Sequence, residues 1–260
     1  MGLWTPEHAR TLIPTALIMV LVAALLRLIL GKRNLKIRMI PFQILSCVIV
    51  LLEIGKQTMS VIRGYDLYHL PFHFCSLFIF MLPVMAFYRG KHRQTVAGIT
   101  AALSFSMFLL MLIYPNLIYS AWDIENYFAN YFAFHTVSFH NVVMLAFLLI
   151  LMLNLHEPAS GKEHNAVALF SVGFCVVSAS MAHLLKTNYA NFYRCNIPVF
   201  ETLRLAVQEA AGYVAAQLLY VLIVSVLTVA FVMMSYWLYR LLRRLTLRKG
   251  TCICAESAVK

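Results

Sequence analysis

Seven apolar stretches joined by short polar connections constrain this chain more than any other feature of its sequence. Each stretch approaches or exceeds the roughly 20 residues that a helix needs to cross the hydrocarbon core of a bilayer. None alternates apolar and polar residues as a strand would, and a spanning helix satisfies its own backbone hydrogen bonds. We therefore predict an all-α polytopic membrane protein, a bundle of about seven transmembrane helices at residues 11–30, 40–62, 71–88, 95–114, 131–154, 166–185 and 213–239.

The composition agrees with this fold class. Of the 260 residues, 62% are hydrophobic and only 12% are charged, whereas soluble proteins carry about 25% charged residues. These values exclude an ordinary soluble enzyme. They also exclude a nucleic-acid-binding module, although a net charge of +11 would favour one in a soluble chain. We predict a single transmembrane domain over residues 1–245 and a short cytoplasmic tail over residues 246–260.

The basic residues indicate the orientation of the chain. Of the 21 Lys and Arg, 15 lie in one set of alternate connections, near residues 27–38, 89–93, 162 and 240–260. Positive residues beside spans are enriched on the cytoplasmic side. We therefore expect an N-terminus outside the cell or in a lumen, and a C-terminus in the cytoplasm. Such a multi-pass protein would lie in the endoplasmic reticulum or another endomembrane of a eukaryote, or in the plasma membrane of a bacterium.

Polar side chains inside or beside the spans gather on the outer side of this topology. Ionisable groups at membrane depth are expensive, so by default they mark a site or its internal partners. Two of them, Glu53 and Lys56, are three residues apart and could equally pair across one helical turn. We predict a polar cavity open to the outer or lumenal face, with further groups from His69, His73, Cys75, His135, His140, His183, Lys186, Arg194, Glu201 and Arg204.

Cys75 is the candidate nucleophile of this cavity. Pro71 is well placed as the first residue of a helix, so we expect Cys75 in the second helical turn, where the helix dipole favours a thiolate. On a regular helix His73 points about 200° away from Cys75, so a general base must come from another span. The fifth span begins on the same side of the membrane with His135 and His140, and the spacing leaves both open.

The other cysteines have simpler interpretations. Cys47 and Cys175 lie within spans and behave as small apolar residues. Cys252 and Cys254 follow a basic stretch beside the last span, a pattern typical of reversible palmitoylation. The sequence contains no nucleotide-binding loop and no metal-ligand spacing such as His-Glu-x-x-His, so we expect neither a cofactor nor a metal.

Three segments resemble those of a known membrane family. Residues 70–76, Leu-Pro-Phe-His-Phe-Cys-Ser, resemble the Pro-Leu-His-Leu-Cys segment of the YwaF-like integral membrane family. Residues 138–141, Ser-Phe-His-Asn, resemble its second histidine segment, with Asn141 in place of the usual Gly. Asn188-Tyr189, followed by Pro198, resembles its Asn-Tyr…Pro loop with a somewhat longer spacing. The three motifs occur in the family's order.

This resemblance implies a function. The family includes a eukaryotic branch described as a lysophospholipid acyltransferase that makes ether phospholipids with one Cys and one His. The Cys matches Cys75, and the His matches His140 or His135, of which the Ser-His motif favours His140. The resulting hypothesis is a transacylase whose partners are membrane phospholipid and lysophospholipid. Its expected substrate-binding residues are His73, Asn141, Asn188, Tyr189, Lys186 and Arg194, the last two together with Arg204 as candidates for the lipid phosphate.

The expected reaction and the alternative functions depend on the same residues. The Cys75 thiolate would attack an acyl ester to give a thioester, with the His as base and then as acid. Acyl-CoA is made in the cytosol, so a lumenal site favours a phospholipid donor. A lipid hydrolase with the same Cys–His pair, a seven-span receptor and a small-molecule transporter remain alternatives. The receptor hypothesis lacks support because residues 88–90, after the third span, are Tyr-Arg-Gly, whereas a seven-span receptor would have Asp-Arg-Tyr there.

Overall fold

The computed structural model describes residues 3–158, 161–196 and 198–256, and for Pro198 and residues 246–256 it describes the backbone alone. Within these ranges every regular element is a helix. The long helices are α1 (Pro6–Leu30), α2 (Leu35–Ile62), α4 (Arg93–Ile113), α6 (Tyr131–Met152), α7 (Gly161–Leu184) and α9 (Tyr213–Glu256). The shorter elements are α3 (Leu77–Phe87), α5 (Ala121–Glu125), α8 (Pro198–Ala211) and the 3-10 turns η1 (Leu67–His69), η2 (Pro115–Leu117) and η3 (Tyr189–Asn191).

The predicted fold class is confirmed. The six long helices are each long and apolar enough to cross a membrane, and in α9 the candidate span is Tyr213–Leu245. At 11 residues, α3 is about 16 Å long and covers only part of a bilayer core. The chain is therefore a multi-pass integral membrane protein. The count of seven spans and the outside N-terminus stay predictions.

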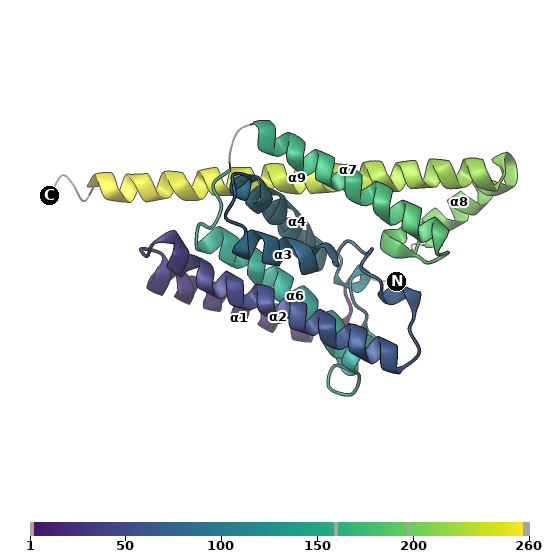
Figure 1. Cartoon of the computed structure of the whole chain (residues 1–260), viewed down its shortest axis with the longest axis horizontal. Coiled ribbons are helices and arrows are strands. Elements are labelled where there is room, and N and C mark those ends of the chain that lie inside the picture. Colours follow the sequence, from purple (N-terminus) through teal and green to yellow (C-terminus); the bar gives the residue numbers. More distant parts are fainter. Residues whose placement is uncertain (1–2, 159–160, 197, 257–260) are drawn as a thin grey trace.

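The helices are arranged around α4. Figure 1 shows α1, α2 and α6 along one side of the molecule and α7 and α9 along the other, with α3 and α4 between them. α4 packs against α3, α6, α7 and α9. Its contact surface includes the small residues Ala97, Gly98, Ala101, Ala102 and Ser104, all of them buried. Small residues let helix backbones approach closely, which is how helices associate inside a bilayer.

The prediction of a helix starting at Pro71 is wrong. The chain forms η1, then an irregular segment, and α3 begins only at Leu77. Irregular backbone at membrane depth is tolerated where protein groups satisfy it, and two side chains do so here. The Tyr189 hydroxyl donates to the Leu67 carbonyl at 2.5 Å, and the Ser178 hydroxyl donates to the Phe72 carbonyl at 2.8 Å. Cys75 therefore lies just before a helix, and not in its second turn.

A buried polar cluster ties α7 and α9 together at the far end of the bundle. His156 lies in the connection before α7, with Nε2 3.1 Å from the Glu163 carboxylate and Nδ1 3.0 Å from the Tyr239 hydroxyl. The Tyr236 hydroxyl donates to Glu163 at 2.6 Å, and Arg243 donates to the His156 carbonyl at 3.0 Å. Because all five residues are almost fully buried, they fix α9 against the core.

The predicted boundary between the last span and the tail falls inside α9. The expected span ended at residue 239, whereas the candidate span continues to Leu245 and the helix to Glu256. Arg243 explains part of this extension because it is buried in the polar cluster, so its charge does not end the span. The side chains of Cys252 and Cys254 lie outside the described ones.

Candidate functional site

A cavity of about 460 Å³ opens among five long helices, α2, α4, α6, α7 and α9, and the connections at residues 68–76, 117–118 and 188–196. Its volume falls within the roughly 300–1,000 Å³ typical of small-molecule sites. Its polar residues, apart from Thr228 of α9, come from the end of α2, the 68–76 segment, the first turns of α6 and the 188–196 loop: Glu53, Lys56, Tyr68, His69, His73, Cys75, Ser76, His135, Thr136, His140, Asn188, Asn191 and Asn196. Half of its apolar residues come from α4, α7 and α9: Met107, Leu110, Phe174, Leu227, Phe231 and Val232.

This division gives the cavity two chemically different parts. Most of the polar residues lie toward helix ends and in connections, whereas Met107, Phe174 and Phe231 lie well inside α4, α7 and α9. Helix interiors of a membrane protein lie at hydrocarbon depth, and helix ends lie near the headgroups. The cavity is thus suited to an amphiphilic ligand with its polar head among the histidines and its apolar chain between α4, α7 and α9.

Glu53 is the centre of the polar network in this cavity. Its carboxylate accepts from the Lys56 ammonium at 2.8 Å and from the Gln57 amide at 2.7 Å, and His135 Nε2 lies 3.3 Å from its other oxygen. Gln57 also donates to the His69 carbonyl at 2.8 Å. The carboxylate therefore connects α2 to α6 and to the segment that carries Cys75. A buried charge is retained in this way only where partners compensate its desolvation.

The two histidines of α6 are held differently. His140 Nδ1 lies 2.6 Å from the Thr136 carbonyl oxygen, one turn earlier in the same helix. An oxygen acceptor requires a protonated Nδ1, which leaves Nε2 of the neutral ring with a free lone pair. His135 instead directs Nε2 toward the Glu53 carboxylate. Both rings line the cavity, but only His140 has a local bond that leaves Nε2 as the acceptor.

The segment before α3 is held in place by aromatic contacts. The His73 ring packs edge-on against Tyr68 and Tyr189, with centroid distances of 4.5 and 5.4 Å. His73 Nε2 donates to the Tyr68 carbonyl at 3.1 Å, and His69 stacks on Phe132 at 4.7 Å. Burial and the nearby positive charge of Lys56 lower the pKa of His69, so its ring is neutral at pH 7. These contacts fix the turn that presents Cys75 to the cavity.

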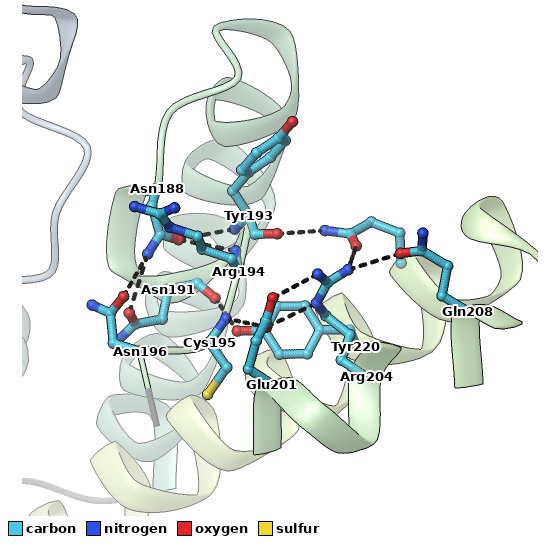
Figure 2. A network of polar contacts seen from close by, with 11 residues as sticks. Asn188, Asn191, Tyr193, Arg194, Cys195, Asn196, Glu201, Arg204, Gln208 and Tyr220 are labelled. Carbon is cyan, nitrogen blue, oxygen red and sulfur yellow. Dashed lines mark hydrogen bonds and ion pairs between the residues drawn. The ribbon is translucent and has the colours of Figure 1, made fainter. Parts of the chain in front are cut away.

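A loop from η3 toward α8 covers the polar end. Asn188 accepts from the backbone N–H groups of Tyr193 and Arg194 at 3.3 and 3.1 Å, and its amide donates to the side chain of Asn196 at 3.2 Å (Figure 2). Ala190 and Asn191 adopt left-handed backbone angles, with φ of 46° and 63°. Such angles are costly for Ala and persist where surrounding structure holds them.

The structure brings five of the predicted site residues to one cavity: Cys75, His140, His135, His73 and Asn188. Tyr189 lies directly behind it, fully buried against His73. Asn141, Lys186 and Arg194 do not line it, so their binding roles stay predictions. Arg204 lies in an ion pair with Glu201, at 2.6 Å.

The sequence did not predict Glu53 and Lys56 as site residues. The signal was present, since both are ionisable groups inside a span, but a pair within one helical turn explained them equally well. The structure shows that they do pair and that they also line the cavity. Among the described residues, no group of three or more His, Cys, Asp or Glu is arranged to hold a metal ion.

Comparisons with known proteins give the chain its family. No curated protein and no solved structure matches it. A family model does: residues 3–239, nearly the whole chain, match the model of the TMEM164 family, a family of transmembrane proteins. The match includes every residue that lines the cavity. The chain therefore belongs to the TMEM164 family.

Proposed function

We propose that this protein is a membrane-embedded lysophospholipid acyltransferase that works through a thioester on Cys75. The observation that carries the proposal is the shared cavity: Cys75, His135 and His140 line it together with a separate apolar part. A nucleophile, a base and room for an acyl chain are the elements that acyl transfer needs. The resemblance of residues 70–76 and 138–141 to the YwaF-like segments supports the same reading.

The first half-reaction forms the acyl-enzyme. The Cys75 thiol gives its proton to His140 Nε2 while its sulfur attacks the ester carbonyl carbon of a phospholipid. The ester C–O bond then breaks, and the leaving lysolipid oxygen takes the proton from His140. Cys75 now carries the acyl chain as a thioester. This acyl chain lies in the apolar part of the cavity, between α4 and α9.

The second half-reaction transfers the chain. The hydroxyl of an acceptor lysophospholipid gives its proton to His140 Nε2 and attacks the thioester carbonyl carbon. The C–S bond breaks, and the thiolate of Cys75 recovers the proton. The two halves use the same groups in reverse order, so the reaction needs neither a cofactor nor an external acid.

His140 is the preferred base of the two candidates. Its Nδ1 donates to the Thr136 carbonyl, which orients the ring and keeps Nε2 unprotonated. His135 Nε2 lies 3.3 Å from a Glu53 oxygen, so a carboxylate faces that nitrogen. We assign His135 to the polar network that supports the site, with Glu53 as its positioning residue.

Lys56 is the cation best placed for a lipid phosphate. Its ammonium has three N–H donors, and within the described chain Glu53 accepts one of them. Among the described residues that line the cavity, Lys56 is the one Lys or Arg. Lys186 and Arg194, the cations that the sequence favoured, do not line it. Lys56 thus takes over the phosphate-binding role in the proposal.

A lipid hydrolase is the second candidate, because water in place of the lysolipid hydroxyl would release a fatty acid from the same thioester. The test is to incubate the purified protein with acyl-labelled phospholipid, with and without lysophospholipid. We expect label in newly formed phospholipid only when the acceptor is present. Label in free fatty acid regardless of acceptor would identify a hydrolase. No change in the donor under either condition would contradict both and leave a binding or transport function.

A further inference from the structure

α8 is an amphipathic helix that turns its polar face toward the protein and its apolar face outward. An amphipathic helix on a soluble protein has the opposite orientation. Its polar stripe, Glu201, Arg204 and Gln208, forms hydrogen bonds with other protein groups. Its apolar stripe has the spacing of one helix face and points away from the protein: Val199, Leu203, Ala206 and Ala210. The side chains of Val199 and Leu203 are 76% and 61% exposed, and the neighbouring Phe200 is 56% exposed.

The polar stripe ties α8 to the loop before it. Arg204 donates to both oxygens of Glu201, at 2.6 and 2.9 Å, and Glu201 accepts the backbone N–H of Cys195 at 2.9 Å (Figure 2). Arg204 also donates to Gln217 of α9 at 3.1 Å, and Gln217 donates to the Tyr193 carbonyl at 2.9 Å. The Arg204 guanidinium lowers the pKa of the Glu201 carboxyl, so this tether is charged at neutral pH.

The tethered loop is the one that covers the polar end of the cavity. Asn188, Asn191 and Asn196 line the cavity, and Asn188 accepts the N–H groups of Tyr193 and Arg194. The Tyr220 hydroxyl of α9 donates to the Asn191 carbonyl at 2.5 Å. A continuous set of hydrogen bonds thus runs from α8 to residues that line the cavity.

We propose that the apolar stripe of α8 lies in the lipid of the bilayer interface, and that the Glu201–Arg204 tether holds α8 and the 188–196 loop together at headgroup depth. The candidate span of α9 begins directly after α8 and also exposes apolar side chains, among them Tyr213, Val214 and Leu218. A polar stripe turned inward and an apolar stripe turned outward is the pattern of a helix whose surroundings are hydrocarbon. α8 then sets the depth at which a lipid headgroup meets the cavity, independently of the acyl-transfer proposal.

Tryptophan fluorescence in liposomes tests this placement. Trp4, Trp122 and Trp237 are replaced by Phe, and a single Trp is then introduced by Leu203→Trp on α8. Leu218→Trp, on the exposed surface of the α9 span, is the lipid-facing control. We expect lipids with brominated acyl chains to remove most of the emission from both positions, and aqueous iodide to remove little from either. Phe200→Trp repeats the test on the same side of α8 if Leu203→Trp folds poorly.

Two results would overturn the proposal. Quenching of the α8 tryptophan by iodide and not by brominated lipid would place α8 in water. The α8 tryptophan could instead be shielded from both quenchers while brominated lipid quenches Leu218→Trp. That result would show that protein, such as a second copy of the chain, covers the apolar stripe.

The tether has its own test in the same liposomes. Arg204→Gln removes the ion pair, and we expect it to reduce the brominated-lipid quenching of Leu203→Trp. Glu209→Gln changes one charge on an exposed position of the same helix and should leave the quenching unchanged. Equal quenching in Arg204→Gln and the parent protein would contradict the role of the tether.

Discussion

His140 Nδ1 donates to the carbonyl oxygen of Thr136 at 2.6 Å, one turn earlier in α6. The bond fixes the ring at the wall of the cavity and selects the tautomer in which Nε2 carries the lone pair. A general base needs that nitrogen within hydrogen-bond reach of the proton that it removes. In the proposed mechanism, the helix itself thus orients His140 for proton transfer before any substrate is bound.

Removing this ring tests its role. We expect His140→Ala to lower the rate of acyl transfer by ~10²–10⁴, the usual worth of a positioned acid–base group. His183 is the matched control, because its Nδ1 makes the same bond to a carbonyl one turn earlier, that of Ala179, and it does not line the cavity. His183→Ala should stay within a few-fold of the parent rate. Equal losses in the two variants would show that the effect is on the fold.

The cysteines offer a second comparison. We expect Cys75→Ala to abolish acyl transfer with folding intact, since no other group in the proposal can form the thioester. Cys47 is exposed and Cys175 is buried, and both are free thiols outside the cavity. Cys47→Ala and Cys175→Ala should therefore leave the rate within a few-fold. Full activity in Cys75→Ala, measured with labelled phospholipid, would refute the covalent mechanism.

Lys56 is tested by varying the acceptor. Lys56→Gln keeps a donor for Glu53 but removes the positive charge, so we expect the KM for lysophospholipid to rise about ten- to a hundred-fold, the worth of one hydrogen bond to a charged group. The KM for a monoacylglycerol, which lacks the phosphate, should not change. Lys186→Gln, at a cation outside the cavity, serves as the control. Equal effects on both acceptors would mean that Lys56 only stabilises Glu53.

The orientation of the chain is open to a direct test. From the distribution of Lys and Arg, we expect a glycosylation acceptor inserted within residues 115–130 to be modified in microsomes. An acceptor within residues 31–40 should remain unmodified. The reverse pattern would place the cavity on the cytoplasmic side, where acyl-CoA is available as a donor.

The sequence predicted the fold class because apolar length and charge placement are strong local signals. It could not predict the start of α3. Pro71 is a good first residue for a helix, but the bonds that hold the segment irregular come from Tyr189 and Ser178, which are more than 100 residues away in the chain. Tertiary contacts of this kind override a local preference.

Tertiary contacts also explain why the sequence predicted only part of the candidate site. A regular helix would have pointed His73 away from Cys75, whereas the observed turn lets both line the cavity. The i,i+3 spacing of Glu53 and Lys56 correctly indicated a pair, yet it could not reveal that His135 of α6 joins them. The inward polar stripe of α8 was equally hidden, because its partner Gln217 lies on another helix.

The central claim is that Cys75 carries the acyl chain between donor and acceptor. Mass spectrometry of the peptide that contains Cys75, after incubation with phospholipid and no acceptor, measures this most directly. We predict that the peptide gains the mass of one acyl chain, that hydroxylamine removes it as expected for a thioester, and that lysophospholipid discharges it. An unmodified Cys75 in a preparation that transfers acyl chains would contradict the account.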